Sequence, residues 1–439
     1  MTGAVLSPGQ AAIVLFGLFF LLMFLRVPVA FALGLACLPI LAIEPRLSVM
    51  SLAQETFNAY NSFILLAVPF FLLTANLMNT GGITDRLMKL SRTMVGHFPG
   101  GLAQINVVLS IFFAGISGSS TADAASQSKL FIEAQRKEGY DDSFSVAITA
   151  VSAVLAVIVP PSILMIVWGG ILTTSIGALF LAGIVPGLLI GLAQMATVHA
   201  YAVRRGYPTY PRATWSQFTG ALAHSSLALM TPVIIIGGKI FGWFTATESA
   251  AIAVLYAGTL SFIVYREMDL KGLYGALLDT GKLAGVALFC VGTASMFGWL
   301  LAYYKIPDAI LTDVRSWNMG FYGVGFFIAF VFLVVGCFLD AIPAIIICGP
   351  ILQPLAKGVA MDPVHFAMIG IVSLAFGLVT PPYGLCLMIA CSVAGMRVRD
   401  AIKDTMIMLV PMLLVLALVI AWPAASLFLP SLISPDFLR

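Results

Sequence analysis

The sequence predicts an all-α polytopic membrane protein with about ten crossing helices and two re-entrant hairpins in an inverted repeat. Of 439 residues, 61% are hydrophobic and 9% are charged, whereas soluble domains are about half apolar and about one quarter charged. Apolar runs of about 20 residues, the length that a hydrocarbon core of ~30 Å requires, recur along the chain. A pair of motifs also repeats at half the chain length. Lipid is therefore the expected solvent of this chain.

Ten apolar runs are long enough to be interpreted as crossings. No small-residue cleavage pattern follows the first run, so we expect it to be retained and not removed as a signal peptide. The six cysteines lie in apolar stretches without CxxC or Cys/His spacing, which indicates neither a metal site nor a disulfide framework. The predicted crossings are residues 11–25, 27–43, 62–80, 142–177, 180–203, 217–240, 245–265, 273–302, 363–396 and 405–430.

Two further apolar segments, 98–134 and 320–356, break in the middle at small and polar residues. Because their halves look too short to cross a membrane alone, we interpret each segment as a re-entrant hairpin that enters and leaves on one side. With an outward N-terminus, this topology places most of the 22 Lys and Arg residues on the inner side, as the positive-inside rule requires. The two hairpin bases then lie on opposite sides of the membrane, as in an inverted repeat.

The repeat rests on two landmarks at one spacing. The small, hydroxyl-rich segment 115–123 corresponds to segment 336–344, which begins 221 positions later. The diproline Pro160-Pro161 is likewise followed, 221 positions later, by Pro381-Pro382. Two landmarks at one offset of half the chain indicate an internal duplication.

Each diproline lies in the middle of an apolar run. Proline removes a backbone donor and clashes with the preceding turn, so the helix must break there and release carbonyl groups at membrane depth. Lipid cannot satisfy these groups, so each break must face protein, water or a bound ion. The oxygen-rich tip 117–121 favours a hard monovalent cation, and half-helix N-termini favour an anion. The breaks thus favour a cation-coupled anion transporter; the alternative is that each diproline only kinks a buried helix.

Acidic residues near the two tips are candidate site residues. Asp123 and Asp340 stand at or just after the tips, where an unpaired charge is costly and usually functional. The alternative for both is a polar network that only holds each tip. Glu248 is better explained as a first-turn capping residue, and His224 and Lys239 lie near span ends, where they can snorkel. No arginine lies deep in either motif, so amides, hydroxyls and helix ends would hold an anion.

The predicted organisation alternates transport and scaffold parts. The polar–apolar segments 47–60 and 82–97 are candidates for interfacial helices or for arms that grip a scaffold. The predicted domains are N-terminal scaffold helices with an amphipathic arm (1–97), a first transport repeat (98–178), scaffold helices and connections (179–319), a second transport repeat (320–397) and a C-terminal helix (398–439).

With these residues in view, the chain resembles the large membrane subunit of TRAP transporters, the tripartite ATP-independent periplasmic systems, over nearly its whole length. The resemblance is carried by segment 26–34, the tip 115–123, Val159–Ser162, segment 242–250 and Thr380–Gly384. It implies a sodium-driven elevator that imports an organic acid and no enzymatic activity. It also implies a small Q-type membrane subunit and a periplasmic substrate-binding protein as partners, in a bacterial inner membrane. In that membrane, the positive-inside topology described above predicts that both termini are periplasmic.

The resemblance also implies site residues, with no cofactor beyond the coupling sodium ions. Substrate contact would fall to Ser119, Ser120, Asp123 and Asp340. One sodium site would be formed by Ser117, Ser119, Ala156, Ile158 and Pro161. The other would be formed by Phe338, Asp340, Gly377, Val379 and Thr380.

Three other functions stay open on the sequence alone. A stand-alone sodium/dicarboxylate-type transporter would share the inverted repeat but would need no binding protein. An intramembrane enzyme would need facing catalytic groups; Asp123 and Asp340 could form an aspartyl pair, but they stand on re-entrant tips beside helix breaks. A passive channel would need a ring or a continuous polar path. Paired binding tips in one chain fit alternating access better.

Overall fold

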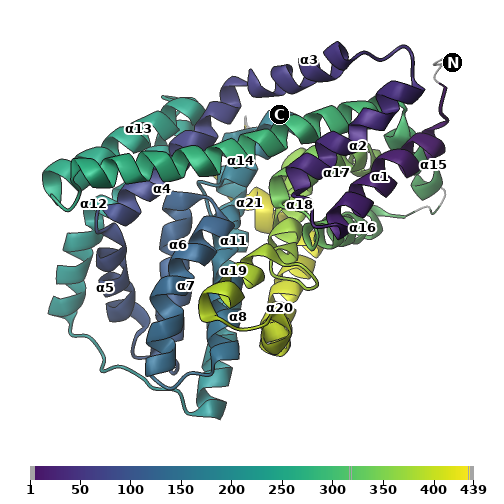
Figure 1. The fold of residues 1–439 in the computed structure, drawn as a ribbon. Helices are drawn as coiled ribbons and strands as arrows, with labels where there is room; N and C mark the ends of the chain where they lie inside the picture. The colour runs from purple at the N-terminus through teal and green to yellow at the C-terminus, as the bar shows by residue number, and fades with distance from the viewer. Residues whose placement is uncertain (1–4, 316, 318, 434, 436–439) are drawn as a thin grey trace.

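The computed structural model describes residues 5–315, 317, 319–433 and 435, and every regular element in them is helical (Figure 1). In chain order the elements are α1 (Pro8–Phe24), α2 (Val29–Ile43), α3 (Val49–Tyr60), η1 (Phe63–Leu66), α4 (Ala67–Thr80), α5 (Ile83–Val95), α6 (Gly101–Ser117), α7 (Ser120–Lys137), α8 (Asp142–Ala153), α9 (Leu155–Ile158), α10 (Ile163–Leu172), α11 (Ile176–Arg205), α12 (Trp215–Ile240), α13 (Ala246–Thr259), η2 (Leu260–Val264), α14 (Leu270–Tyr303), α15 (Ile306–Arg315), α16 (Phe321–Gly336), α17 (Ala341–Gly358), α18 (Pro363–Gly377), α19 (Leu385–Ala394), α20 (Val398–Ala421) and α21 (Ala424–Ile433).

The two halves of the chain follow the same order of helices. Adding 221 to the bounds of α7 gives 341–358, the bounds of α17. The same shift carries α6, the α8–α9 pair and α10 onto α16, α18 and α19, with bounds that differ by at most two residues. The duplication predicted from two motifs therefore covers both hairpins and both broken helices.

The copies differ most clearly at α14. The shift carries α3 and α4 to 270–281 and 288–301, and both ranges fall within this single helix. Its 34 residues correspond to a length of about 51 Å at 1.5 Å per residue. Because that exceeds a hydrocarbon core of ~30 Å, α14 must be inclined or extend beyond the core. Figure 1 shows it as a long green helix running across the molecule.

The helices form two bodies. α14 packs against α2, α3 and α4, while α13 packs against α4 and α12 against α5; we call α1–α5 with α12–α15 the frame. α7, α8, α19 and α20 pack together, as do α16, α17 and α18; we call α6–α11 with α16–α21 the hairpin bundle. The bodies meet mainly where α4 and α5 contact α6 and where α14 contacts α17. α11, expected among the scaffold helices, packs against α6, α20 and α21 in the bundle.

Length and composition identify fewer crossings than the ten predicted. Among the described residues, seven helical segments pass as possible membrane spans, or eight if the bent pair Asp142–Ile158 and Ile163–Leu172 counts as one. α1 and α2, at 17 and 15 residues, are shorter than this test requires. The predicted run 405–430 is two helices, because Pro423 has no N–H to continue the hydrogen bonds of α20.

One limb of the second hairpin also corrects the sequence analysis. α17 has 18 residues and is apolar enough to count as a possible span, so the statement that each limb is too short to cross is wrong for this helix. The break at its N-terminus, and not its length, is what makes the segment a hairpin. Membrane re-entry of either hairpin stays a prediction.

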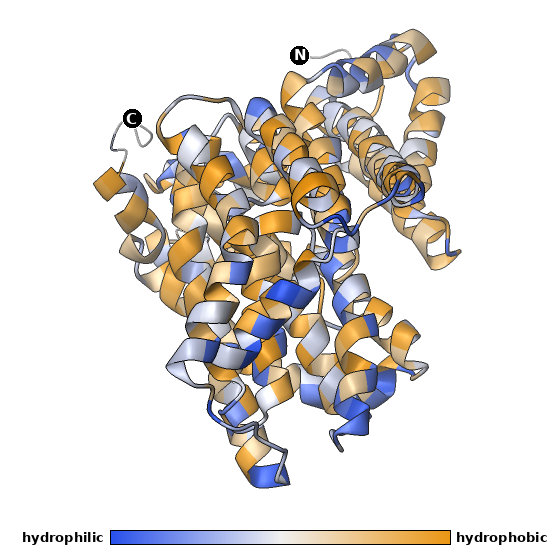
Figure 2. Cartoon of the chain, turned by 90° about the vertical axis from the view of Figure 1, so that its left-hand side faces the viewer, coloured by the Kyte–Doolittle hydropathy of each residue, from blue (hydrophilic) through white to orange (hydrophobic). Residues whose placement is uncertain are grey.

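Apolar side chains cover the outside of the molecule as well as its core. Figure 2 shows hydrophobic residues along most of the helices and hydrophilic residues in fewer, scattered stretches. Phe24 and Leu255, for example, are 83% and 72% exposed. An apolar outer surface of this extent indicates a lipid environment.

Candidate functional site

The first hairpin turns at Gly118, between α6 and α7. Its φ of 61° lies in the left-handed region that glycine adopts without strain. Ser119 then begins α7, because its Oγ accepts a hydrogen bond from the N–H of Ala122 at 3.4 Å. The tip touches the first break directly, since the N–H of Ile163 donates to the Gly118 carbonyl at 3.2 Å. A Cβ at this glycine would lie only 2.9 Å from the Pro161 carbonyl oxygen.

The first diproline separates α9 from α10 and bends the span by 43°. In a continuous helix, the N–H groups of residues 160 and 161 would bind the carbonyls of Ala156 and Val157, but prolines have no N–H. The Ser162 hydroxyl replaces one of them, donating to the Val157 carbonyl at 2.8 Å. The Ala156 carbonyl is left without its helical donor. The break therefore offers a main-chain oxygen, as an ion site would need.

The other two carbonyls assigned to the first sodium site lie in different surroundings. The Pro161 carbonyl lies beside the tip at Gly118. The Ile158 carbonyl faces α11, so close to Gly183 that this glycine has no room for a side chain. Only part of the predicted ligand set thus lies at the tip itself.

The second break satisfies its carbonyls with main-chain donors. The second diproline removes the donors for Gly377 and Leu378. The Gly377 carbonyl accepts instead from the N–H of Thr380 at 3.0 Å, and the Leu378 carbonyl accepts from the N–H of Cys386 at 2.9 Å. The Thr380 hydroxyl donates back to the Phe376 carbonyl at 2.7 Å.

The second tip places Asp340 at the start of α17. Its Oδ1 accepts a hydrogen bond from the N–H of Ala341 at 2.8 Å. The preceding limb, α16, is held against the break by glycines, because a Cβ on Gly377 would lie 2.5 Å from the main-chain carbon of Gly336. Main chain therefore packs on main chain between the second hairpin and the second broken helix.

A cavity of about 200 Å³ brings both tips and both breaks together at the boundary between the bundle and the frame. It is smaller than the roughly 300–1,000 Å³ common for drug-sized ligands, which suits a small molecule. The lining includes Gly118–Thr121 of the first tip, Asp340–Ile342 of the second, Val157 and Leu378 of the breaks, Val68 and Leu72 of α4, and Leu283, Val286 and Ala287 of α14.

Three of the four predicted substrate residues line this cavity, namely Ser119, Ser120 and Asp340. Asp123 does not; its side chain is 2% exposed within the first turn of α7, beside the Ser117 hydroxyl. Its Oδ2 has no hydrogen-bond partner among the described residues. The predicted sodium ligands that lie outside the lining are Ser117, Ala156, Ile158, Pro161, Phe338, Gly377, Val379 and Thr380.

The sequence analysis did not predict the residues with which the frame lines the cavity. Leu72, Leu283 and Val286 are apolar residues on long apolar helices, so nothing in their pattern distinguishes them from lipid-facing neighbours. Cys386 was also missed; it lies beside the Ser120 hydroxyl. Its place five residues after Pro381, the first proline of the second diproline, was the available signal, because the chain must re-form a helix there.

Residues 16–425 match the family model described as tripartite ATP-independent periplasmic transporter, DctM component. The chain belongs to this family. It is 38% identical to the uncharacterized protein YgiK of Salmonella typhimurium, over 97% of this chain and 98% of that protein. It is 36% identical to the sialic acid TRAP transporter large permease protein SiaM of Vibrio cholerae, over 94% and 96%. It is 35% identical to the sialic acid TRAP transporter permease protein SiaT of Haemophilus influenzae, over 94% of this chain and 67% of SiaT.

The fold also resembles a solved structure, the YdaH transporter of Alcanivorax borkumensis, with a TM-score of 0.54 at 14% identity, covering 85% of this chain and 87% of that one. At this identity the likeness concerns the fold alone. Family membership confirms the resemblance drawn from the tips and diprolines. The DctM-component chain is thus a multi-pass transporter permease, and its named TRAP relatives are permeases and not enzymes.

Proposed function

We propose that this DctM component imports a small organic acid together with sodium by moving the hairpin bundle against the frame. The cavity between the two bodies carries the proposal, because both tips and both breaks reach it from the bundle while α4 and α14 close it from the frame. A substrate held by the tips would travel with the bundle and change sides as the bundle slides along the frame. This is the geometry that inverted-repeat transporters use for alternating access.

The chemistry of the cavity supports an anion and a cation together. α7 and α17 both begin at its wall, and the positive ends of helix dipoles favour a carboxylate. Asp340 brings a negative charge to the same cavity, which repels an incoming anion. A sodium ion beside Asp340 would cancel that repulsion, so sodium should bind before the organic acid. The sodium ligands assigned above from the family resemblance are part of this proposal.

The proposal includes two partners and a location. SiaT and SiaM are named for sialic acid, a carboxylate, which supports the organic-acid class. This chain covers 67% of SiaT, and we propose that a separate small membrane subunit supplies the remainder. A periplasmic binding protein would deliver the substrate, since the family is one component of a tripartite system. The membrane would then be the bacterial inner membrane, with both termini periplasmic.

Uptake into proteoliposomes tests the proposal. The chain is reconstituted with its small subunit, and uptake of a labelled organic acid is measured with and without a sodium gradient and the cognate binding protein. We expect uptake to require both the sodium gradient and the binding protein. Full uptake by this chain alone, without the small subunit or the binding protein, would instead support a stand-alone transporter.

Two variants with a matched control test the site. Asp340→Asn should reduce uptake more than tenfold and flatten its dependence on sodium, and Ser119→Ala should reduce it less. Asp362→Asn is the control, because Asp362 also begins a helix, accepting from the N–H of Val364 at 2.7 Å, but lies outside the cavity. Equal losses in the two aspartate variants would mean that capping, and not the cavity, explains Asp340.

A further inference from the structure

Two of the segments that connect the frame and the bundle lie side by side. The connecting segments are residues 96–100, 206–214 and 316–320. Two main-chain hydrogen bonds join the first two: the N–H of Tyr210 donates to the Gly96 carbonyl at 3.0 Å, and the N–H of Gly101 donates to the Pro208 carbonyl at 3.2 Å. We call residues 96–101 with 208–210 the hinge, because a movement of the bundle against the frame would bend both segments there.

The Tyr210 ring lies across the hinge. A Cβ on Gly96, which follows α5 of the frame, would lie 3.3 Å from the ring. A Cβ on Gly101, which begins α6 of the bundle, would lie 2.9 Å from it. The ring therefore packs on main chain that belongs to both bodies, and a side chain at Gly101 would displace it.

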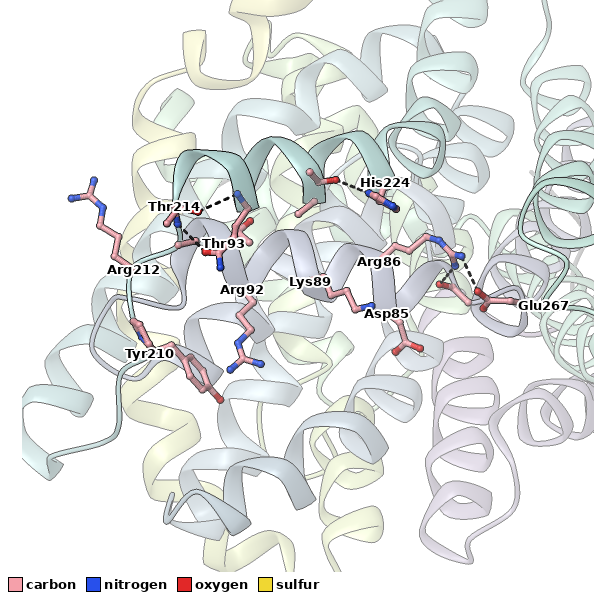
Figure 3. Close-up of a pocket in the computed structure, with 16 residues that line it drawn as sticks. Asp85, Arg86, Lys89, Arg92, Thr93, Tyr210, Arg212, Thr214, His224 and Glu267 are labelled. Carbon is pink, nitrogen blue, oxygen red and sulfur yellow. Dashed lines mark hydrogen bonds and ion pairs between the residues drawn. The ribbon is translucent and has the colours of Figure 1, made fainter.

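The frame holds Tyr210 through α5. The Arg92 guanidinium lies 4.3 Å from the centre of the Tyr210 ring, which is within the range of a cation–π contact. Figure 3 shows this pair at the wall of a pocket of about 890 Å³ between α5 and the start of α12. Because its main-chain N–H binds Gly96 and its ring binds Arg92, Tyr210 should stay with α5 when the two bodies move.

The hydroxyl of the same side chain reaches the bundle. It donates a hydrogen bond to Oε1 of Glu138, the residue that ends α7 of the first hairpin. The other carboxylate oxygen, Oε2, is buried and has no hydrogen-bond partner in the part of the chain that the structure describes. A hydrogen bond to a carboxylate is stronger than one between neutral groups. The Tyr210 side chain thus ties α5 to the second limb of the hairpin.

The helices of the two bodies meet without polar side-chain contacts. Frame side chains bind within the frame, as Asn76 binds Thr280 at 2.8 Å, and bundle side chains bind within the bundle, as Arg205 binds Asp404 at 3.2 Å. Among the described residues, no side-chain hydrogen bond or ion pair joins a frame helix to a bundle helix. Apolar surfaces can slide past one another without leaving a polar group unsatisfied, so the bond from Tyr210 is the one that resists movement.

We propose that the hydrogen bond from Tyr210 to Glu138 is a latch, which holds the bundle in the position described here and opens before the bundle moves. Glu138 moves with α7 while Tyr210 stays with α5, so the bond cannot persist once the two bodies slide. Such a latch presupposes the bundle movement proposed above, and it adds the pair of residues that controls how readily the movement occurs.

Double electron–electron resonance of the full chain in lipid nanodiscs measures the distance between the two bodies. One spin label replaces Leu270 of the frame and the other replaces Arg399 of the bundle, because both side chains are exposed and lie outside the hinge. The labels are attached through unnatural amino acids, since thiol labels would also react with the native cysteines. A chain that occupies two positions of the bundle gives two distances, and the ratio of their populations is the quantity to compare.

Three variants separate the latch from a general loosening. Tyr210→Phe keeps the ring and removes the hydroxyl, so the population of the second distance should rise at least tenfold relative to the first, equivalent to about 1.4 kcal/mol. Glu138→Gln should raise it less, roughly threefold, because an amide oxygen still accepts from the hydroxyl. The control is Tyr207→Phe, which removes a hydroxyl that donates to Asp141 at 2.7 Å within the bundle and should leave the ratio unchanged.

Three results would overturn the latch. An unchanged ratio in Tyr210→Phe, in a chain whose ratio still responds to added sodium, would reject the latch and leave the moving bundle standing. A single distance in every variant, with and without sodium, would reject the bundle movement itself and the latch with it. An equal rise in Tyr207→Phe would mean that any loss of a hydroxyl in this connecting segment has the same effect. Thermal unfolding accompanies each variant, and Glu138→Gln carries the test if Tyr210→Phe does not fold.

Discussion

Ser162→Ala should destabilise the region around the first helix break more than the loss of any other single side-chain oxygen there. The Ser162 hydroxyl donates to the Val157 carbonyl at 2.8 Å and accepts from the N–H of Met165 at 3.4 Å. The side chain is fully buried, so water cannot replace it. Removing the first bond orphans a buried carbonyl, which costs about 1–3 kcal/mol. Losing the helix cap adds about 0.5–2 kcal/mol, so the free energy of unfolding should fall by roughly 1.5–5 kcal/mol.

Denaturant titration of the purified chain in detergent micelles measures this change. Ser162→Thr keeps the hydroxyl and should restore most of the stability. Cys386→Ala is the matched control at the second break, because there the Leu378 carbonyl is satisfied by a main-chain N–H that the substitution leaves in place. A loss below about 0.5 kcal/mol for Ser162→Ala, or an equal loss for Cys386→Ala, would refute the reasoning that the hydroxyl substitutes for a missing prolyl donor.

Two further predictions concern packing and pH. Gly377→Ala should destabilise the chain by about 1–3 kcal/mol, because the new methyl group would press α16 and α18 apart. The control is Gly285→Ala in α14, which has open space around it and should cause no such loss. Equal free energies of unfolding for the two variants would contradict this prediction. Burial, and next a hydrogen bond to Asp141 at 2.7 Å, raises the pKa of Tyr207 above its ordinary value of 10. The folded state therefore holds this proton more tightly, so its stabilising contribution is present below pH 10 and is lost as the pH rises above 10. Unfolding temperatures between pH 8 and 11 should fall less steeply for Tyr207→Phe than for the unmodified chain, and identical slopes would count against the assignment.

Much of the fold could be predicted because the duplication repeats its signals. The offset of 221 residues between the two diprolines predicts both bounds of α17 from those of α7 without error. Where the sequence offered only apolar length, prediction was poorer. The run 405–430 looked continuous, but a proline at 423 ends one helix and starts another, and hydropathy averages do not register the loss of one backbone donor.

The candidate site could be predicted only as far as its polar tips. Ser119 and Asp340 stand at breaks that composition reveals, and both line the cavity. Asp123 carries the same kind of signal, yet it points into the buried side of its hairpin. Which face of a helix meets the cavity depends on how α7 packs against α8 and α19, and a short apolar–polar pattern does not specify that.

The two halves of the chain keep the same break but satisfy it by different means. Position 162 of the first half corresponds to Tyr383 of the second, which has no short hydroxyl to reach back one turn, and the main-chain N–H of Cys386 performs that role instead. The carbonyl of Ala156 has lost its donor, whereas the corresponding carbonyl of Gly377 is bound by Thr380. The second break consequently has fewer free main-chain oxygens, and in the proposed second sodium site the Asp340 carboxylate would supply the charge. Two sodium sites built on these breaks should therefore differ in ligand chemistry, the first resting on neutral oxygens and the second on a carboxylate, although the helices that carry them are copies.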